Sequence, residues 1–60
     1  MEKITIEIET VNDAFHDSEY AMEGEVSAIL ANLSHSIGDG RWPEIIRDLN
    51  GNTVGKITIK

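Results

Sequence analysis

A strict two-residue alternation at both ends of the sequence is the feature that most limits what this chain can fold into. In residues 3–10, polar residues alternate with isoleucines, which are Ile4, Ile6 and Ile8. Near residue 60, Ile57 and Ile59 alternate with polar residues in the same way. β-Branched side chains at a period of two are typical of strands that bury one face. We therefore predict a strand at each end, with the isoleucines toward a core and the polar side chains toward solvent.

The central segment has the period of a helix. From about residue 18 to residue 37 the apolar positions are spaced by one, three or four and form one stripe, which consists of Met22, Val26, Ile29, Leu30, Leu33 and Ile37. Asp17 or Ser18 is predicted to cap the start, and Gly38 to take the left-handed position after the end. Inside a helix, Gly24 costs about 1 kcal/mol relative to alanine, so a start near Glu25 is the alternative.

Two further runs, residues 42–49 and 53–60, flank Asn50-Gly51. This dipeptide is favoured in hairpin turns whose two central residues both have positive φ. The two runs are therefore predicted to form a β-hairpin. Ile45 and Leu49 are predicted to face the helix, and Ile46 to face the opposite way unless a bulge intervenes.

Together these segments predict an α+β fold in a single domain, residues 1–60. We expect a two-layer β-α-β-β arrangement in which one helix packs on a three-stranded antiparallel sheet. The C-terminal strand is predicted to lie in the middle, because its lysines then face acidic residues across the ladder. The pairs in question join Lys56 and Lys60 to Glu7, Glu9 or Glu2. The chain has no cysteine, so packing must stabilise the fold, and Phe15 is predicted to close the edge of the core.

Charge is distributed unevenly along the chain. Residues 1–40 contain nine acidic residues and one basic residue, whereas residues 41–60 contain two acidic and four basic residues. An acidic surface repels nucleic acid and attracts a basic protein surface, such as one that normally holds phosphates. The alternative is a solvated face that only keeps the protein in solution. We predict a protein partner with a basic surface and no direct binding of nucleic acid.

A second candidate for binding is the Trp42-Pro43 pair. Proline cannot donate to a strand ladder, so this end of the run lies at an edge or outside the sheet. Trp42 is then predicted either to cap the core or to stand exposed beside Arg41. In the exposed position it is the best candidate for a binding anchor, since Trp and Arg are enriched at binding hot spots. The candidate partner-binding residues are Glu19, Glu23, Glu25, Asp39, Arg41 and Trp42.

No group of residues has the composition and spacing of a catalytic or metal site. The absence of cysteine excludes thiolate nucleophiles and cysteine-based zinc sites. His16 and His35 are separated by nearly the whole predicted helix, and no two-histidine metal motif links them. The run from Asp48 resembles a calcium loop only in part, because Gly51 stands fourth where such a loop needs glycine sixth. We therefore predict no enzyme activity, no metal and no cofactor.

Most of the chain resembles small proteins that are common in bacteriophage and prophage genomes. The matching pieces are residues 4–10, residues 12–15, Glu25-Val26 with Ile29-Leu30 and Leu33, and residues 47–55, of which the Asp48–Gly55 turn is the best marked. The family has no catalytic motif to carry over. The resemblance implies a phage accessory factor, and such factors often bind host machinery, including CRISPR and restriction systems.

The function predicted from these observations is that of a phage-type accessory protein that binds and inhibits a host protein, such as a component of a CRISPR or restriction system. The alternative is a small self-associating structural or accessory phage protein with no inhibitory role. With no apolar run of about 20 residues and no leader, we predict no membrane contact and a location in the cytoplasm of a bacterial host cell. The open sheet predicts a homodimer through a sheet edge or the helix.

Overall fold

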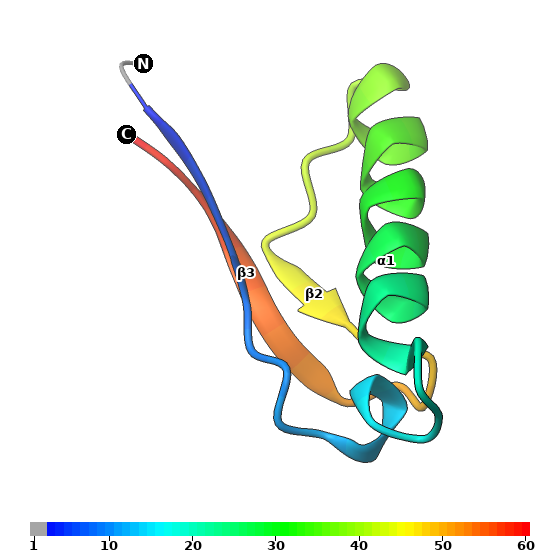
Figure 1. Ribbon diagram of the computed structural model, residues 1–60. Coiled ribbons are helices and arrows are strands. Elements are labelled where there is room, and N and C mark those ends of the chain that lie inside the picture. Colours follow the sequence, from blue (N-terminus) through cyan, green and yellow to red (C-terminus); the bar gives the residue numbers. More distant parts are fainter. Residues whose placement is uncertain (1–2) are drawn as a thin grey trace.

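The computed structural model describes residues 3–60, which form one layer of sheet and one layer of helix (Figure 1). The elements in chain order are β1 (Ile4–Ile8), the 3-10 helix η1 (Asp13–Phe15), α1 (Ala21–Gly38), β2 (Ile45–Arg47) and β3 (Thr53–Ile59). Each strand runs antiparallel to its neighbour. The predicted α+β fold, with one helix and a three-stranded antiparallel sheet, is confirmed.

The C-terminal strand β3 lies in the middle of the sheet, whose order is β1-β3-β2. The predicted strand order is therefore confirmed. Glu7 lies opposite Lys56, as the charges suggested. Lys60 instead lies beside Lys3, with which it exchanges two backbone hydrogen bonds, because the register that aligns the isoleucines leaves no acidic residue across from it. Glu2 lies outside the described residues.

The hydrophobic core forms where the sheet meets α1 and η1. Its buried members are Ala14, Phe15, Ile29, Leu33, Ile46 and Val54, and Ile8, Val26, Ile37 and Ile57 pack against them. Phe15 is 1% exposed and is the largest fully buried side chain. Its backbone N–H donates to the carbonyl of Asn12 (3.0 Å), which closes η1 and turns the ring inward. Phe15 thus lies inside the core, deeper than the edge position predicted for it.

The start of α1 lies between the two predicted positions. The helix begins at Ala21, after residue 18 and before Glu25. No side chain among the described residues caps its first turn, so the predicted cap by Asp17 or Ser18 is wrong. The backbone carbonyl of Ser18 accepts a hydrogen bond from the N–H of Ala21 (3.2 Å), so a backbone turn precedes the helix where a capping side chain was expected.

The end of α1 is built on Gly40 and not, as predicted, on Gly38. Gly40 has a φ of 83°, whereas Gly38 is still helical. The N–H of Gly40 donates to the carbonyl of Ile37, and the N–H of Arg41 donates to the carbonyl of Ser36, both at 2.9 Å. This pair of bonds is the usual termination of a helix that is followed by a left-handed glycine. Of the two glycines in Gly38-Asp39-Gly40, only the second takes that position.

In β2, Ile46 turns toward the core, contrary to the prediction. Ile46 is 3% exposed, whereas Ile45 is 46% and Leu49 is 71% exposed. The pairing register against β3 shifts between Ile46 and Arg47. Because β3 skips Val54 at this point, the extra residue lies in β3, and burial along β2 still alternates: Ile45 and Arg47 are exposed and Ile46 is buried. Ile45 and Ile46 are adjacent apolar residues, so the sequence alone does not show which of them faces the core.

Residues 48–52 connect β2 to β3, and Leu49, Asn50 and Gly51 form the turn at the centre of this loop. Only Gly51 has a positive φ, of 84°, so the predicted turn with two positive φ values is wrong. The N–H of Asp48 donates to the carbonyl of Asn52 (2.9 Å), and the N–H of Gly51 donates to the carbonyl of Asp48 (3.0 Å). A tight turn followed by a left-handed glycine is a common three-residue hairpin loop.

The side chain of Asp48 organises this loop. The residue is buried, and its Oδ1 accepts hydrogen bonds from the backbone N–H groups of Asn50 (2.9 Å) and Asn52 (3.0 Å). Its Oδ2 accepts a bond from the side-chain amide of Asn12 (3.3 Å), which ties the loop to the segment before η1. The partial likeness to a calcium loop therefore has a structural explanation, since the carboxylate binds backbone N–H groups.

Asp48 should make the protein less stable in acid. Burial by itself raises the pKa of the Asp48 carboxyl, but the hydrogen bonds from Asn52, Asn12 and Asn50 outweigh it and hold the pKa below its ordinary value. The unfolded chain then takes up the proton at a higher pH than the folded protein. The stabilisation is complete above the ordinary aspartate pKa of about 3.9 and is lost as the pH falls through the folded-state value. We expect the melting temperature to fall in that range.

The matched control is Asp48→Asn, which keeps the size of the side chain and removes its charge. This variant should melt at a lower temperature than the wild type at about pH 7, and the difference should shrink as the pH falls below the ordinary aspartate pKa and through the folded-state pKa of Asp48. Thermal unfolding monitored by circular dichroism measures the melting temperatures of the wild type and the variant at each pH. A difference that stays constant over this pH range would contradict the role assigned to the carboxylate.

Candidate binding surface

The predicted partner-binding residues lie at opposite ends of α1. Glu19 and Glu23 lie at its N-terminal end, and the segment from Asp39 to Trp42 follows its C-terminal end. A helix of 18 residues is about 27 Å long. The six predicted residues therefore do not form one surface.

Glu25 belongs to neither end. It is 8% exposed, and its Oε2 accepts a hydrogen bond from the backbone N–H of Leu49 at 2.7 Å. This bond joins the second turn of α1 to the loop between β2 and β3. Glu25 is therefore a structural residue and not part of an exposed acidic surface. The prediction placed it with Glu23 because the sequence does not show which helical carboxylate meets the loop.

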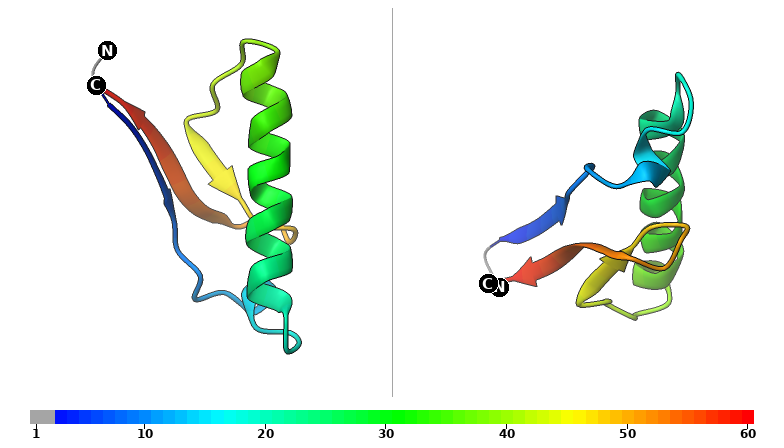
Figure 2. Two further views of the ribbon diagram at one scale, coloured as in Figure 1. Left: turned by 45° about the horizontal axis from the view of Figure 1, so that its top comes forward. Right: turned by 90° about the horizontal axis from the view of Figure 1, so that it is seen from below.

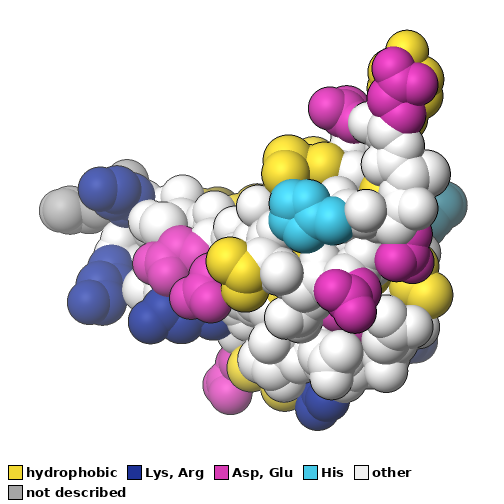
Figure 3. All heavy atoms as spheres, turned by 60° about the horizontal axis from the view of Figure 1, so that its bottom comes forward, with side chains coloured by type: hydrophobic (Ala, Val, Ile, Leu, Met, Phe, Trp, Pro, Cys, Tyr) yellow, Lys and Arg dark blue, Asp and Glu magenta, His cyan; other side chains and the backbone are white. Residues whose placement is uncertain are grey.

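The first exposed site is the acidic tip, which we define as Asp17, Glu19, Tyr20 and Glu23. All four are exposed, and Tyr20 is 71% exposed. The connection between η1 and α1 that carries Asp17, Glu19 and Tyr20 protrudes at one end of the molecule (Figure 2). Carboxylates gather there with hydrophobic atoms, and several Lys and Arg side chains lie at the opposite side of the same view (Figure 3).

Asp17 and Tyr20 belong to the acidic tip but were not among the predicted binding residues, and Tyr20 is the one of the two that adds an aromatic ring. Its signal in the sequence is its position outside the apolar stripe of the helix, between Glu19 and Glu23. Tyrosine is one of the residues most enriched at binding hot spots, and here it has no part in the core. The tip therefore combines negative charge with an exposed aromatic ring.

The second site, around Trp42, is only partly open. Trp42 is 41% exposed and lines a shallow hollow of about 230 Å³ together with Pro43, Glu44, Ile57 and Ile59. Trp42 thus lies beside Ile57 and Ile59 of β3 and is also partly exposed, so its position is between the two predicted alternatives.

The preceding residues Asp39 and Arg41 are exposed. The hydroxyl of Ser36 donates to the backbone carbonyl of Arg41 (2.8 Å) and holds this segment against the end of α1.

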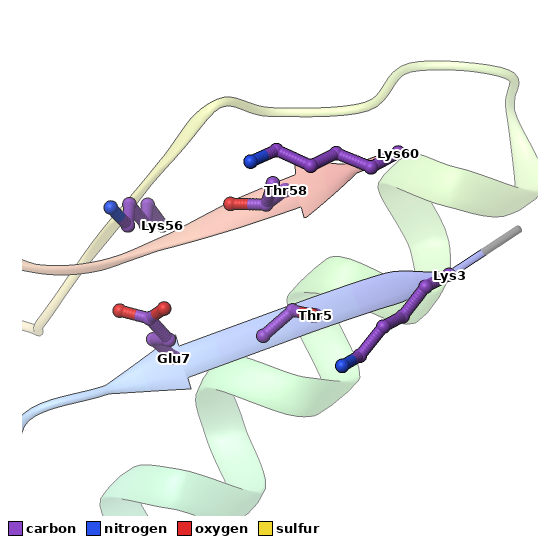
Figure 4. Close-up of a pocket in the computed structure, with 6 residues that line it drawn as sticks. All are labelled: Lys3, Thr5, Glu7, Lys56, Thr58 and Lys60. Carbon is purple, nitrogen blue, oxygen red and sulfur yellow. The ribbon is translucent and has the colours of Figure 1, made fainter. Parts of the chain in front are cut away.

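The third exposed feature is the ribbon formed by β1 and β3. Toward residues 3 and 60 this ribbon diverges from α1 (Figures 1 and 2). On its inner face, Ile8 and Ile57 pack on the core, whereas Ile4, Ile6 and Ile59 are 40–46% exposed. Six polar side chains stand on the outer face (Figure 4): Lys3, Thr5, Glu7, Lys56, Thr58 and Lys60. The alternation predicted these two faces, but not that the inner face would extend beyond the helix.

Within residues 3–60, no group of three or more His, Asp or Glu residues is arranged to hold a metal ion. In the same part of the chain no helix is long and apolar enough to cross a membrane. No protein-family model matches the chain, and no curated protein or solved structure matches it either. The resemblance to small phage proteins therefore stays a prediction.

Proposed function

We propose that this protein is a phage-type accessory protein that binds a host protein through the acidic tip and so blocks it. The target would be a protein with a basic surface, such as the nucleic-acid-binding surface of a CRISPR or restriction component. The phage setting and the location in a bacterial cell rest on the sequence resemblance. The mode of binding rests on the arrangement of the tip.

The observation that carries this proposal is the exposed tyrosine among carboxylates. A solvated acidic face needs no aromatic ring, and Tyr20 contributes nothing to the core of this small protein. Carboxylates steer a basic partner toward the tip and select against nucleic acid. The ring can then supply the apolar contact that gives most of the affinity at a hot spot. The carboxylates that attract the partner and the aromatic ring of Tyr20 thus lie together in the acidic tip.

Inhibition by occupation follows from this chemistry. A basic surface that holds phosphates offers Lys and Arg side chains, and the carboxylates of Asp17, Glu19 and Glu23 can compete for the same groups. Between Ile4 and Gly40 the sequence has no basic residue that would oppose such contacts. The protein would therefore act by covering a site, without a chemical step.

The test uses Glu19→Lys with Glu23→Lys, and separately Tyr20→Ala. Glu25 is left intact, because its carboxylate holds the hairpin loop. The matched control is Asp39→Lys with Glu44→Lys, which makes the same change of charge at the other end of α1. Tagged proteins are incubated with bacterial lysate, and the retained protein is identified and measured for affinity.

We expect the wild type and the control to retain the same host protein and to release it as salt is raised. The double reversal should weaken binding by about 100-fold, and Tyr20→Ala by about 30-fold, which is roughly 2 kcal/mol. Expression of the wild type, and not of the double reversal, should raise the plating efficiency of a phage that the host defence restricts. Equal retention by the double reversal and the control would reject the acidic tip as the binding surface.

The second candidate function, self-association without inhibition, is favoured by a different observation. The inner face of the ribbon leaves three isoleucines partly exposed, and no charged side chain lies on that face of β1 and β3. None of these isoleucines belongs to the acidic tip, so self-association through this face does not require the tip.

A further inference from the structure

The free edge of β1 carries unpaired backbone groups in a regular pattern. Lys3 and Lys60 exchange two hydrogen bonds across the ribbon, and the N–H of Glu9 donates to Val54. In an antiparallel ladder the residues that bond to the neighbour alternate with residues whose N–H and C=O groups point away. The backbone N–H and C=O groups of the odd-numbered residues of β1 therefore point toward β3. The N–H and C=O groups of Ile4, Ile6 and Ile8 face away from it, at the edge of the sheet.

The molecule also exposes more surface than its mass requires. Its accessible area is 4485 Å², whereas a compact protein of 6.6 kDa exposes roughly 3,900 Å². Its radius of gyration is 12.0 Å, against about 10 Å for a compact chain of this length. The divergence of the ribbon from α1 contributes to this excess, and Ile4, Ile6 and Ile59 lie on that ribbon. Two copies would together have roughly 1,200 Å² of excess area to cover, which is within reach of a stable interface.

We propose that β1 pairs antiparallel with β1 of a second copy of this chain, about a two-fold axis at Ile6, to give one six-stranded sheet. In this register Ile4 lies opposite Ile8 of the second copy, and Ile6 lies opposite its counterpart. Each of these pairs is a hydrogen-bonded pair, so all the outward N–H and C=O groups of the three isoleucines find partners. The proposal goes beyond the acidic tip and uses none of its residues.

The charges on the outer face favour this register. With the axis at Ile6, Lys3 lies opposite Glu9 of the second copy, and this pair occurs twice. With the axis at Ile8, Glu7 would lie opposite Glu9, and like charges directly across a ladder are destabilising. A second copy thus matches the edge of β1 in three ways: its backbone groups supply the missing hydrogen bonds, its isoleucines lie on the same face of the sheet, and its charges are opposite at Lys3 and Glu9.

Pairing in this direction also covers the inner face. Because the two β1 strands run antiparallel, the core end of one copy comes beside the diverging end of the other. Asn32 and Ser36 line a hollow with residues of β2, so Leu30, on the other flank of the apolar stripe, lies on the β1 side of the helix. Leu30 is 45% exposed. The helix of each copy is therefore placed to cover Ile4 and Ile59 of the other.

The test is a charge swap measured by sedimentation equilibrium. We expect the mass of the wild type to change from one chain to two between about 1 and 100 µM. Lys3→Glu and Glu9→Lys should each weaken the dimer by about tenfold, because each creates two like-charge pairs. The double variant Lys3→Glu/Glu9→Lys should return to within about threefold of the wild type, since it restores both pairs with the signs exchanged. Circular dichroism checks that each variant is folded.

Amide hydrogen exchange provides a second readout. In the dimer the amides of Ile4, Ile6 and Ile8 should become protected as the concentration rises, whereas those of Thr5 and Glu7 are protected at every concentration. A mass of one chain throughout the range would overturn the proposal. A dimer in which the three isoleucine amides exchange freely, or in which the double variant is weaker than both single variants, would also overturn it. The acidic-tip variants should not change the mass.

Discussion

Replacing Phe15 by alanine should remove about half or more of the free energy of unfolding. The side chain is 1% exposed and packs in the single core cluster, so its removal loses the transfer free energy of a whole ring and leaves a cavity. Changes of this kind cost about 3–5 kcal/mol. A chain of sixty residues has a total stability of roughly 3–9 kcal/mol. Urea unfolding followed by circular dichroism measures the loss.

The control for Phe15→Ala is Tyr20→Ala, which removes an aromatic ring five positions along the chain. Tyr20 is 71% exposed, so its removal should change the free energy of unfolding by no more than about 0.5 kcal/mol. Comparable losses in the two variants would contradict the assignment of Phe15 to the core and of Tyr20 to the surface.

Replacing Gly55 by alanine should be almost as damaging, for a different reason. Gly55 lies in the central strand, opposite Ile8 on one side and Ile46 on the other. A Cβ at this position would run into the carbonyl oxygen of Glu7 and would lie 2.8 Å from its carbonyl carbon. Backbone atoms cannot rotate away as a side chain does, so β1 would have to separate from β3. We expect a loss of about 3 kcal/mol or more, measured by urea unfolding.

The matched control for Gly55→Ala is Gly24→Ala in α1. A Cβ at Gly24 would meet nothing within 4 Å, and the residue is helical without a positive φ. This change should stabilise the protein by about 1 kcal/mol, because glycine is a poor helix former. We therefore expect the free energy of unfolding to fall in Gly55→Ala and to rise in Gly24→Ala. A fall in both variants would mean that the helix does not tolerate alanine at residue 24.

The sequence predicted the strands at both ends and the helix between them because their patterns are regular over several residues. The order of the sheet was also predictable, since Glu7 and Lys56 indicated which strands are neighbours. The face of β2 was not, because Ile45 and Ile46 are adjacent apolar residues and either of them could have faced the core. Alternation identifies a buried face only where apolar and polar residues alternate.

The candidate site was predictable only in part. Net charge along the chain indicated an acidic surface, and Glu19 and Glu23 are indeed exposed. Glu25 is inside because its carboxylate reaches the hairpin loop, a contact between residues far apart in sequence. The exposure of Tyr20 depends on where the helix starts, and the missing side-chain cap left that start uncertain by several residues. The divergence of the ribbon from α1 could not be predicted from the sequence, because isoleucines alternate with polar residues in the same way whether their face of the strand is buried or exposed.

The sheet order β1-β3-β2 also determines the order of events during folding. The β2–β3 hairpin and α1 are formed by residues close in sequence, and loops of this length close quickly. β1 can join only when Ile4 meets Ile59, at the other end of nearly the whole chain. We therefore expect β1 to dock late, after the rate-limiting step, so that substitutions in β1 speed unfolding more than they slow folding. Until β1 docks, Val54 and Phe15 form a nucleus that lacks its third strand.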